Sequence, residues 1–288
     1  ERQEQYAQAP PGVREMPCAA RPQGETSQGE IIMSCSRRDF LKQACGGTLA
    51  SVLPVSAFTF LSHEEARAAV ENANVRWGFL VDTRKCVGCG LCVKACKTEN
   101  EIPYDAPVTR TWVERYVITK DGKAHIDSPN GGRDGFIENV INGEEIDPEN
   151  IDKAFFVPKL CNQCDNPPCV QVCPVGATYQ TGDGVVLVDR EWCIGCGYCI
   201  MACPYGVRFF HPVHKVADKC NFCYHRITKG MNPACVDSCA FDARRIANLR
   251  DPDDPVTRII TTERVAVLKD EYGTKPHVFY IGLDENVR

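Results

Sequence analysis

The sequence predicts a loop-rich α+β fold built from two similar metal-binding units. Three observations support this prediction. Nineteen of the 288 residues are cysteines, and sixteen of them fall into four groups of four beyond residue 69. These groups repeat one another in pairs. The apolar stretches between the groups are short, and 19 prolines predict many turns.

Residues 1–68 are expected to be an N-terminal extension that ends in a twin-arginine signal peptide. Arg37 and Arg38 precede an apolar run over residues 44–61 that glycine, serine and proline dilute, as is typical of this export route. Small residues near Ala68 suit cleavage there. A plain helix and an uncleaved membrane anchor are the alternatives. Export by this route implies a protein that is folded beforehand and resides in the periplasm or on the outer face of the cytoplasmic membrane.

Four groups of cysteines follow the signal. Groups I and III share the spacing Cys-x2-Cys-x2-Cys-x3-Cys, which is the spacing of bacterial ferredoxins. Groups II and IV are longer variants of the same plan. In such a run the first three thiolates lie on one tight loop, and the fourth ligates the neighbouring cluster. Group I is Cys86, Cys89, Cys92 and Cys96; group II is Cys161, Cys164, Cys169 and Cys173; group III is Cys193, Cys196, Cys199 and Cys203; group IV is Cys220, Cys223, Cys235 and Cys239.

This spacing favours [4Fe-4S] clusters over other uses of cysteine. A structural zinc site usually draws two ligands from each of two separated hairpins. Groups I and III instead place four cysteines within eleven residues. The four groups use all sixteen cysteines, so none remains for a disulfide. Because every ligand position is a cysteine, four [4Fe-4S] clusters are expected.

An internal duplication relates the groups to one another. Residues 80–96, around group I, align without a gap to residues 187–203, around group III. Group II matches group IV through a shared Cys-Asn-x-Cys start and a later Asn-Pro-x-Cys-Val segment. The chain therefore holds two ferredoxin-like units with two clusters each. The repeat by itself leaves two arrangements open: units I/II and III/IV in series, or a II/III unit nested inside a I/IV unit.

Only short secondary structure elements are expected around the groups. Apolar residues 78–81 and 185–188 precede groups I and III and predict β-strands. A short helix is expected after the fourth cysteine of each group. Because clusters replace much of an apolar core, metal binding and folding should be coupled.

The order of the four groups resembles that of a known family, the iron–sulfur subunits of periplasmic molybdopterin oxidoreductases. The resemblance runs from about Trp77 to the C-terminus. Residues 161–169 and 277–284 are most similar to the tetrathionate and polysulfide reductase branch. Ala240 departs from the family pattern, in which many members have proline after the last cysteine of group IV. This departure concerns the shape of the loop and leaves the ligand in place.

The resemblance implies the nested arrangement. Residues 69–160 would be the first part of the outer unit plus an insertion, residues 161–210 the inner unit, residues 211–250 the second part of the outer unit, and residues 251–288 a C-terminal tail. It also implies four ligand sets, one for each cluster. Set A is Cys86, Cys89, Cys92 and Cys239; set B is Cys96, Cys220, Cys223 and Cys235; set C is Cys161, Cys164, Cys169 and Cys203; set D is Cys173, Cys193, Cys196 and Cys199.

The resemblance further implies a non-catalytic electron-transfer subunit of anaerobic respiration. Electrons would pass through the four clusters between a molybdopterin catalytic subunit and a quinone-reactive membrane subunit. A subunit of a non-molybdenum, quinone-linked membrane complex and a free periplasmic polyferredoxin are the alternatives.

The composition and motifs agree with this expectation. The sequence contains no Gly-rich nucleotide fingerprint and no nucleophile elbow. A net charge of −5 argues against nucleic acid as a partner. After the signal no apolar stretch is long enough to span a bilayer, so membrane association is expected to come from a partner.

Overall fold

The computed structural model describes residues 74–137 and 139–287. These residues belong to one structural unit, Leu61–Arg288. The extension and signal peptide expected over residues 1–68 lie outside the described residues. Among the described residues, no helix is both long and apolar enough to cross a membrane.

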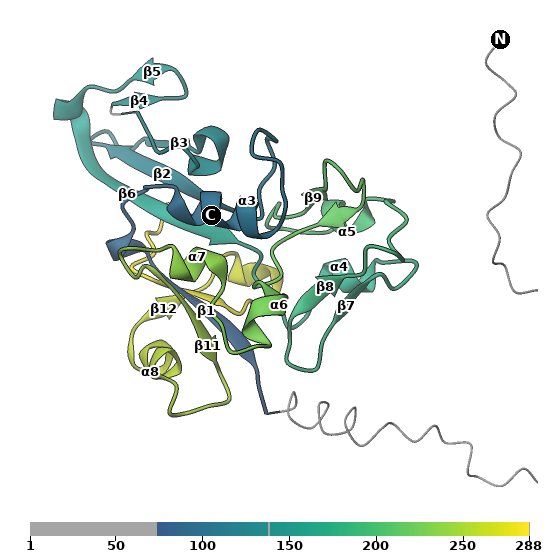
Figure 1. The fold of residues 1–288 in the computed structure, drawn as a ribbon. Helices are drawn as coiled ribbons and strands as arrows, with labels where there is room; N and C mark the ends of the chain where they lie inside the picture. Colours follow the sequence, from purple (N-terminus) through teal and green to yellow (C-terminus); the bar gives the residue numbers. More distant parts are fainter. Residues whose placement is uncertain (1–73, 138, 288) are drawn as a thin grey trace, which may run out of the picture. The chain divides into compact units, whose positions relative to one another are not determined.

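The largest sheet has four strands (Figure 1). Its strand β1 (Trp77–Asp82) leads into group I, and five of its six residues are buried. β1 pairs antiparallel with β11 and parallel with β13, so it is covered on both edges. A strand that is also buried on both faces forms a continuous apolar run without alternation. The strand order is β11 (Arg244–Asn248), β1, β13 (Val278–Ile281) and β12 (Val265–Ala266).

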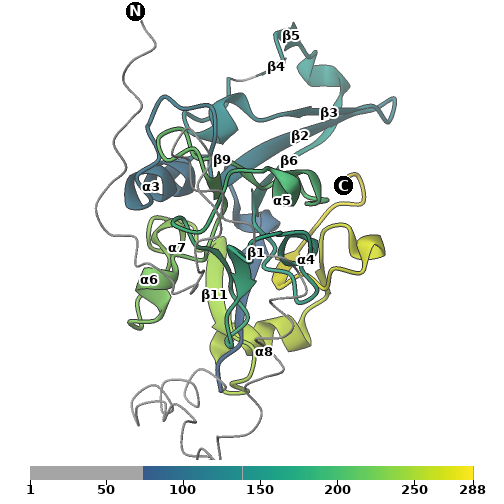
Figure 2. The same cartoon turned by 90° about the vertical axis from the view of Figure 1, so that its right-hand side faces the viewer.

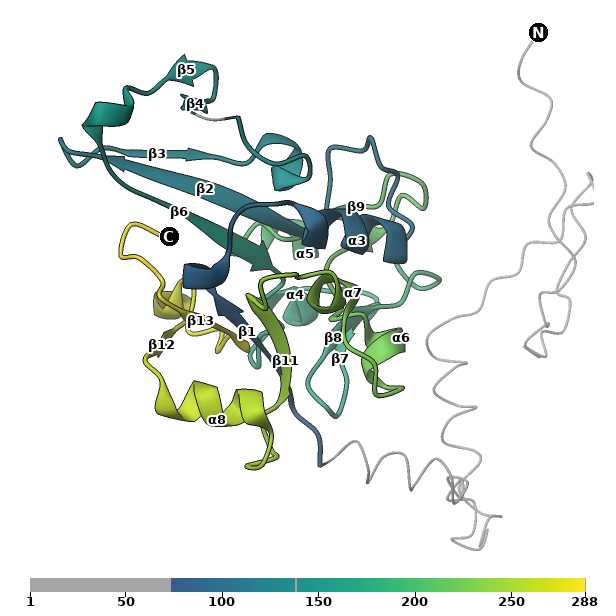
Figure 3. The same cartoon turned by 60° about the vertical axis from the view of Figure 1, so that its left-hand side comes forward.

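A second sheet occupies the segment between groups I and II and delivers the chain into group II. Its central strand β2 pairs antiparallel with β3 and β6. Arg115 on β2 is buried and forms a two-pronged ion pair with Asp127 on β3, at 2.9 and 2.7 Å. In Figure 3 this sheet lies on the opposite side of β1 from helix α8. The strands are β2 (Thr111–Thr119), β3 (Ala124–Asp127) and β6 (Ile151–Leu160), with a small hairpin of β4 (Val140–Ile141) and β5 (Glu144–Glu145) between β3 and β6.

The remaining elements are short. The helices are α3 (Leu91–Glu99), α4 (Pro168–Gln171), α5 (Tyr198–Met201), α6 (Tyr224–Ile227), α7 (Ala234–Asp237) and α8 (Pro255–Thr262). Two hairpin-like pairs are β7 (Thr178–Gln180) with β8 (Val186–Val188), and β9 (Phe209–Phe210) with β10 (Ala217–Asp218). The 3-10 helices are η2 (Thr83–Lys85), η3 (Pro129–Gly132), η4 (Pro148–Asn150) and η5 (Asp270–Tyr272).

The predicted strands over residues 78–81 and 185–188 are confirmed as β1 and β8. The prediction of a helix after each fourth cysteine is wrong for groups II, III and IV, because α4, α5 and α7 end before Cys173, Cys203 and Cys239. In groups II and III a proline follows the fourth cysteine, and proline does not continue a helix. Group I has Lys97 at that position, and α3 runs on to Glu99.

The helices associate in pairs that join distant parts of the chain. Helix α3 of group I packs against α7 of group IV, and α4 of group II packs against α5 of group III. Figure 2 shows α3 and α7 on one side of the fold and α4 and α5 apart from them. The packing therefore brings group I beside group IV and group II beside group III.

Cysteines form part of the apolar core. Phe79 on β1 stacks on Phe222 from the group IV loop, with ring centroids 5.4 Å apart, and both side chains are fully buried. Buried cysteine side chains belong to the same core as this pair. The same buried cluster contains Cys92, Cys161, Cys220 and Cys235.

Gly90 offers a test of how closely the group I loop is packed. It begins α3 with a φ of +73°, and a Cβ there would overlap the carbonyl oxygens of Gly132 and Arg133. Gly122 is the matched control, because its φ is +81° and its surroundings are open. We expect Gly122→Ala to cost about 1–2 kcal/mol for the left-handed backbone alone. Gly90→Ala should cost about 1–3 kcal/mol more, because backbone must move. Thermal unfolding followed by circular dichroism measures both, and equal losses would contradict the packing.

Candidate cluster-binding site

All sixteen cysteines of the four groups lie among the described residues, and all are free thiols. The loops of groups I and III have the same backbone shape, as their shared spacing predicts. In both, a glycine in the left-handed region precedes the helix. Gly90 precedes α3, which carries the last two cysteines of group I, and Gly197 precedes α5, which carries the third cysteine of group III and ends before the fourth. A glycine adopts this conformation without the steric cost of a Cβ.

The members of set A line one cavity. Three of them, Cys86, Cys89 and Cys92, come from group I, and Cys239 comes from group IV. The cavity walls also include Arg244 and apolar side chains. Cys89 reaches the surface, whereas Cys92 is buried. Burial raises the pKa of Cys86 to about 11, and the neighbouring thiols of Cys92 and Cys239 add to the effect.

The members of set C line a second cavity of the same kind. Cys161, Cys164 and Cys169 come from group II, and Cys203 comes from group III. Here the arginine in the wall is Arg208. Burial raises the pKa of Cys164 to about 12, and the neighbouring thiols of its own set contribute.

The members of set B are gathered in the core. Burial raises the pKa of Cys96 well above its usual value, and the nearby thiols of Cys220, Cys235 and Cys223 raise it further. Burial likewise raises the pKa values of Cys220 and Cys235 to about 12. Cys96 is therefore directed away from its own group and toward group IV.

Set D is assembled only in part. Cys193 and Cys199 belong to one apolar cluster around β8 and β10, while Cys196 is exposed on the loop between them. Cys173 is not part of that cluster. Its Sγ accepts a hydrogen bond from the backbone N–H of Thr178 at 3.4 Å. Partial burial opposes ionisation of Cys173, but backbone N–H groups outweigh this effect and lower its pKa.

Sets B and C adjoin within the core. Burial is the main cause of the raised pKa of Cys220, and nearby thiols raise this pKa further. These thiols include Cys161 of set C. Gln163 is fully buried between these two loops, where its Nε2 donates to the carbonyl oxygen of Cys220 at 2.7 Å. Its Oε1 accepts from the N–H of Val186 at 2.7 Å. Sets B and C are thus neighbours across the boundary between groups II and IV.

Two buried arginines test whether the thiols suit an anionic metal centre. Arg244 is 1% exposed, and its two terminal nitrogens meet no oxygen or nitrogen acceptor among the described residues. Burial disfavours its charge, yet the thiols of Cys92, Cys235 and Cys86 raise its pKa. These thiols belong to sets A and B. Burying an unpaired cation is costly, so this arginine fits a site in which the thiols are ionised and hold metal.

Arg208 stands in the same relation to sets C and D. It is buried, its NH1 donates to Thr178 Oγ1 at 3.3 Å, and its NH2 has no oxygen or nitrogen acceptor among the described residues. Burial opposes its charge, but Cys169, Cys161 and Cys199 raise its pKa. Sequence reasoning missed both arginines. Each lies five residues after the last cysteine of its group, and this offset in the repeat is the signal that identifies them.

Hydrogen bonds to sulfur complete the fit. Such bonds stabilise the reduced, more negative state of an iron–sulfur cluster. Among the described residues, no three or more metal-ligating side chains converge as they would on a single ion; a cubane instead takes each thiolate at a separate corner. The N–H donors to sulfur include Phe222 to Cys220 at 3.4 Å, Ala243 to Cys239 at 3.3 Å and Asn100 Nδ2 to Cys96 at 3.5 Å.

Comparison with known proteins identifies the same chemistry. Two family models, each described as a 4Fe-4S dicluster domain, match residues 85–177 and 152–249. The B subunit of tetrathionate reductase from Salmonella typhimurium is 40% identical over 260 residues, which cover 88% of this chain and 91% of that protein. The protein of the same name from Archaeoglobus fulgidus is 43% identical over 217 residues, or 75% of this chain and 86% of that one. The corresponding polypeptide of polysulfide reductase from Wolinella succinogenes is 33% identical over 207 residues, or 72% and 94%.

Arg244 and its neighbour Arg245 form a matched pair of test sites. Arg245 bonds Asp242 at the surface, so Arg245→Gln should cost about 0–1 kcal/mol. If sets A and B hold anionic centres, Arg244→Gln removes the buried cation beside them, and loss of one partner of a buried pair costs about 3–5 kcal/mol. We expect iron to be released faster from the Arg244→Gln variant on warming, as measured by bleaching of the visible absorbance. Equal bleaching rates in the two variants would refute this role of Arg244.

Proposed function

The protein belongs to the family of iron–sulfur B subunits of tetrathionate, polysulfide, arsenate and selenate reductases, and on this basis we propose that it carries electrons through four [4Fe-4S] clusters in a nested pair of dicluster units. It is a non-catalytic electron-transfer subunit of a reductase complex. Each cluster would be held by one of sets A to D. When bound, the clusters supply one-electron redox chemistry.

The packing of the cysteine groups is the observation that carries the nested arrangement. Cys239 shares a cavity with the first three cysteines of group I, and Cys203 shares one with the first three of group II. The helix pairs α3 with α7 and α4 with α5 support the same assignment. A serial arrangement would instead require group II to complete group I.

The electrostatic influences between the sets support a linear order of A, B, C and D. Arg244 lines the cavity of set A and its pKa also responds to Cys235 of set B. Cys220 and Cys161 belong to one buried cluster across B and C, and Arg208 lines the cavity of set C while its pKa also responds to Cys199 of set D. In this order the clusters, when bound, would let electrons pass from each set to the next. The protein's own residues would hold the centres, exclude water from the middle two and compensate their charge.

The two ends of this order open at the surface. Cys89 of set A and Cys196 of set D are exposed. Large exposed apolar side chains accompany both ends: Val87, Leu91 and Phe241 line the cavity of set A, and Trp192, Ile194 and Met201 lie in the sequence of group III or next to it. Exposed apolar patches mark sites of protein contact. We propose that the two ends meet a molybdopterin catalytic subunit and a quinone-reactive membrane subunit.

Cysteine replacement distinguishes the nested from the serial arrangement. The wild-type protein should contain about sixteen iron and sixteen sulfide atoms, as four cubanes require. In the nested arrangement, Cys239→Ser should alter the same cluster signal as Cys89→Ser, because both residues belong to set A. Electron paramagnetic resonance of the reduced protein compares the signals. If Cys239→Ser instead matches Cys196→Ser, the units are in series and the nested proposal is wrong.

The partners and the cellular location are tested together in the native host. We propose export by the twin-arginine route, since Arg37 and Arg38 precede an apolar, glycine-containing run. The tagged protein should therefore co-purify from the outer face of the membrane with a large molybdenum-containing polypeptide. Replacing both arginines with lysine should leave the protein in the cytoplasmic fraction. A native protein that elutes alone, or a complex without molybdenum, would contradict the proposed partners.

A further inference from the structure

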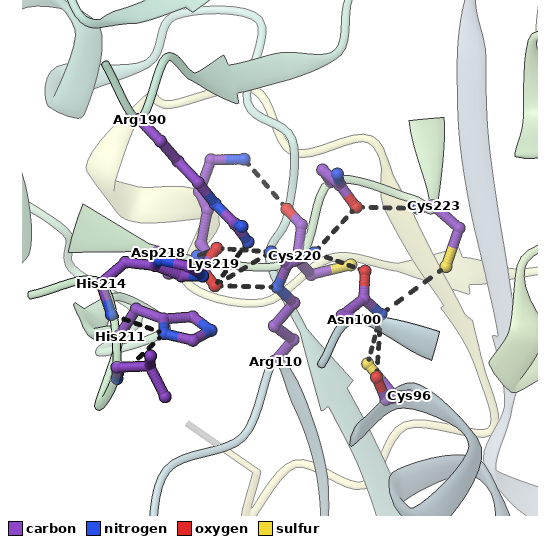
Figure 4. Close-up of polar contacts among 12 residues, drawn as sticks. Cys96, Asn100, Arg110, Arg190, His211, His214, Asp218, Lys219, Cys220 and Cys223 are labelled. Atoms are coloured by element: carbon purple, nitrogen blue, oxygen red, sulfur yellow. Dashed lines mark hydrogen bonds and ion pairs between the residues drawn. The ribbon is translucent and has the colours of Figure 1, made fainter. Parts of the chain in front are cut away.

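Asn100 directs its amide at two ligands of set B. It lies at the end of α3 and is buried. Its Nδ2 donates to the carbonyl oxygen of Cys96 at 2.9 Å and to the Sγ of Cys96 at 3.5 Å, and it lies 4.0 Å from the Sγ of Cys223. Figure 4 shows the amide between the two sulfurs. One side chain thus contacts thiols from groups I and IV.

The orientation of this amide is determined by Arg110. The Oδ1 of Asn100 accepts a hydrogen bond from Arg110 NH1 at 2.5 Å. A guanidinium has only donors, so the amide oxygen must face Arg110 and the NH2 group must face the sulfurs. Rotation of the amide by half a turn would place its NH2 group against the arginine and its oxygen against the sulfurs.

Arg110 is itself held in place from two sides. Its Nε and NH2 donate to Asp218 Oδ2 at 3.2 and 2.9 Å, and both side chains are buried. Its NH1 also donates to Asn221 Oδ1 at 3.2 Å, and this oxygen accepts the backbone N–H of Cys223 at 3.1 Å. Figure 4 follows the series of contacts from Asp218 through Arg110 and Asn100 to the sulfurs. The network therefore reaches set B at two points, through the amide of Asn100 and through the backbone N–H of Cys223.

The Asp218 carboxylate balances the charge of Arg110. The pair as a whole is neutral, and Asn100 is the member of the network whose N–H groups reach the sulfurs of Cys96 and Cys223. A hydrogen bond to a ligating sulfur favours the reduced state, which carries more negative charge. In a buried site of low dielectric constant this preference is larger than at the surface.

We propose that Asn100, by donating to the ligand sulfurs, raises the reduction potential of the cluster that set B would hold, and that the Arg110–Asp218 pair is the positioning pair that keeps its NH2 group facing those sulfurs. This inference rests on the proposed four-cluster function. It means that residues outside the four cysteine groups adjust the potential of the cluster in set B.

The test measures the four cluster potentials of the intact protein by redox titration with electron paramagnetic resonance. Asn100→Leu removes the donors, and Asn100→Asp removes them while keeping an acceptor for Arg110. Each substitution should lower one of the four potentials by at least about 59 mV, which corresponds to a tenfold change in the equilibrium constant of a one-electron reduction. The other three potentials should stay unchanged. Thr98→Val is the matched control, because Thr98 lies in the same helix and its exposed hydroxyl donates to the carbonyl oxygen of Lys94, away from the sulfurs. It should shift none of the potentials.

The role of the ion pair is tested by a double-mutant cycle. The paired change Arg110→Gln with Asp218→Asn keeps the net charge and releases the amide of Asn100. It should lower the same potential in the wild-type protein and have little further effect in the Asn100→Leu variant, because the pair acts through Asn100. Equal shifts in both backgrounds would show that the pair acts independently and would overturn this part of the proposal.

Iron analysis separates the failure of this inference from the failure of the proposed function. A wild-type protein with markedly fewer than about sixteen iron atoms contradicts the four-cluster function itself. With all clusters present, unchanged potentials in Asn100→Leu and Asn100→Asp overturn the role of Asn100. If both variants lose one cluster, Asn100 serves assembly and not the potential, and the inference is likewise wrong.

Discussion

Buried thiols paired with buried cations are the constraint on which the rest of the fold depends. Cys92, Cys220 and Cys235 occupy positions that an ordinary domain fills with aliphatic side chains, and Arg244 lies among them without an oxygen or nitrogen acceptor in the described part of the chain. Burial keeps such thiols protonated in the absence of metal, because it raises their pKa values. Metal binding should therefore be coupled to deprotonation and to folding.

This constraint explains why regular structure is scarce around the groups. A cluster needs several ligands from one tight loop, and in groups II, III and IV the helices α4, α5 and α7 have only about one turn, whereas α3 of group I continues to Glu99. The larger sheets stand outside the loops and deliver the chain to them: β1 leads into group I and β6 into group II. Apolar packing stabilises these sheets, and the buried Arg115–Asp127 ion pair joins β2 to β3.

The family relationship and the residues agree on electron transfer. The features that support it are distributed over the chain and do not form one catalytic cleft. Exposed cysteines lie at the proposed ends of the relay, and buried cysteines lie in its middle. Side chains outside the cysteine groups, among them Asn100, Arg208 and Arg244, surround the thiols with hydrogen-bond donors and positive charge, the two influences by which a protein adjusts the potential of such a centre.

The sequence by itself determined the type of centre and the two strands β1 and β8, and it predicts the sixteen cysteine ligands, because spacing and apolar runs are local properties of the chain. It misplaced the short helices, since a local pattern does not reveal where a ligand loop ends. Only the tertiary structure decided which groups pack together and which buried residues face sulfur. Asn100 and Arg110 meet Asp218 and Cys223 across more than 100 residues of chain, and contacts of that range depend on how the whole chain folds.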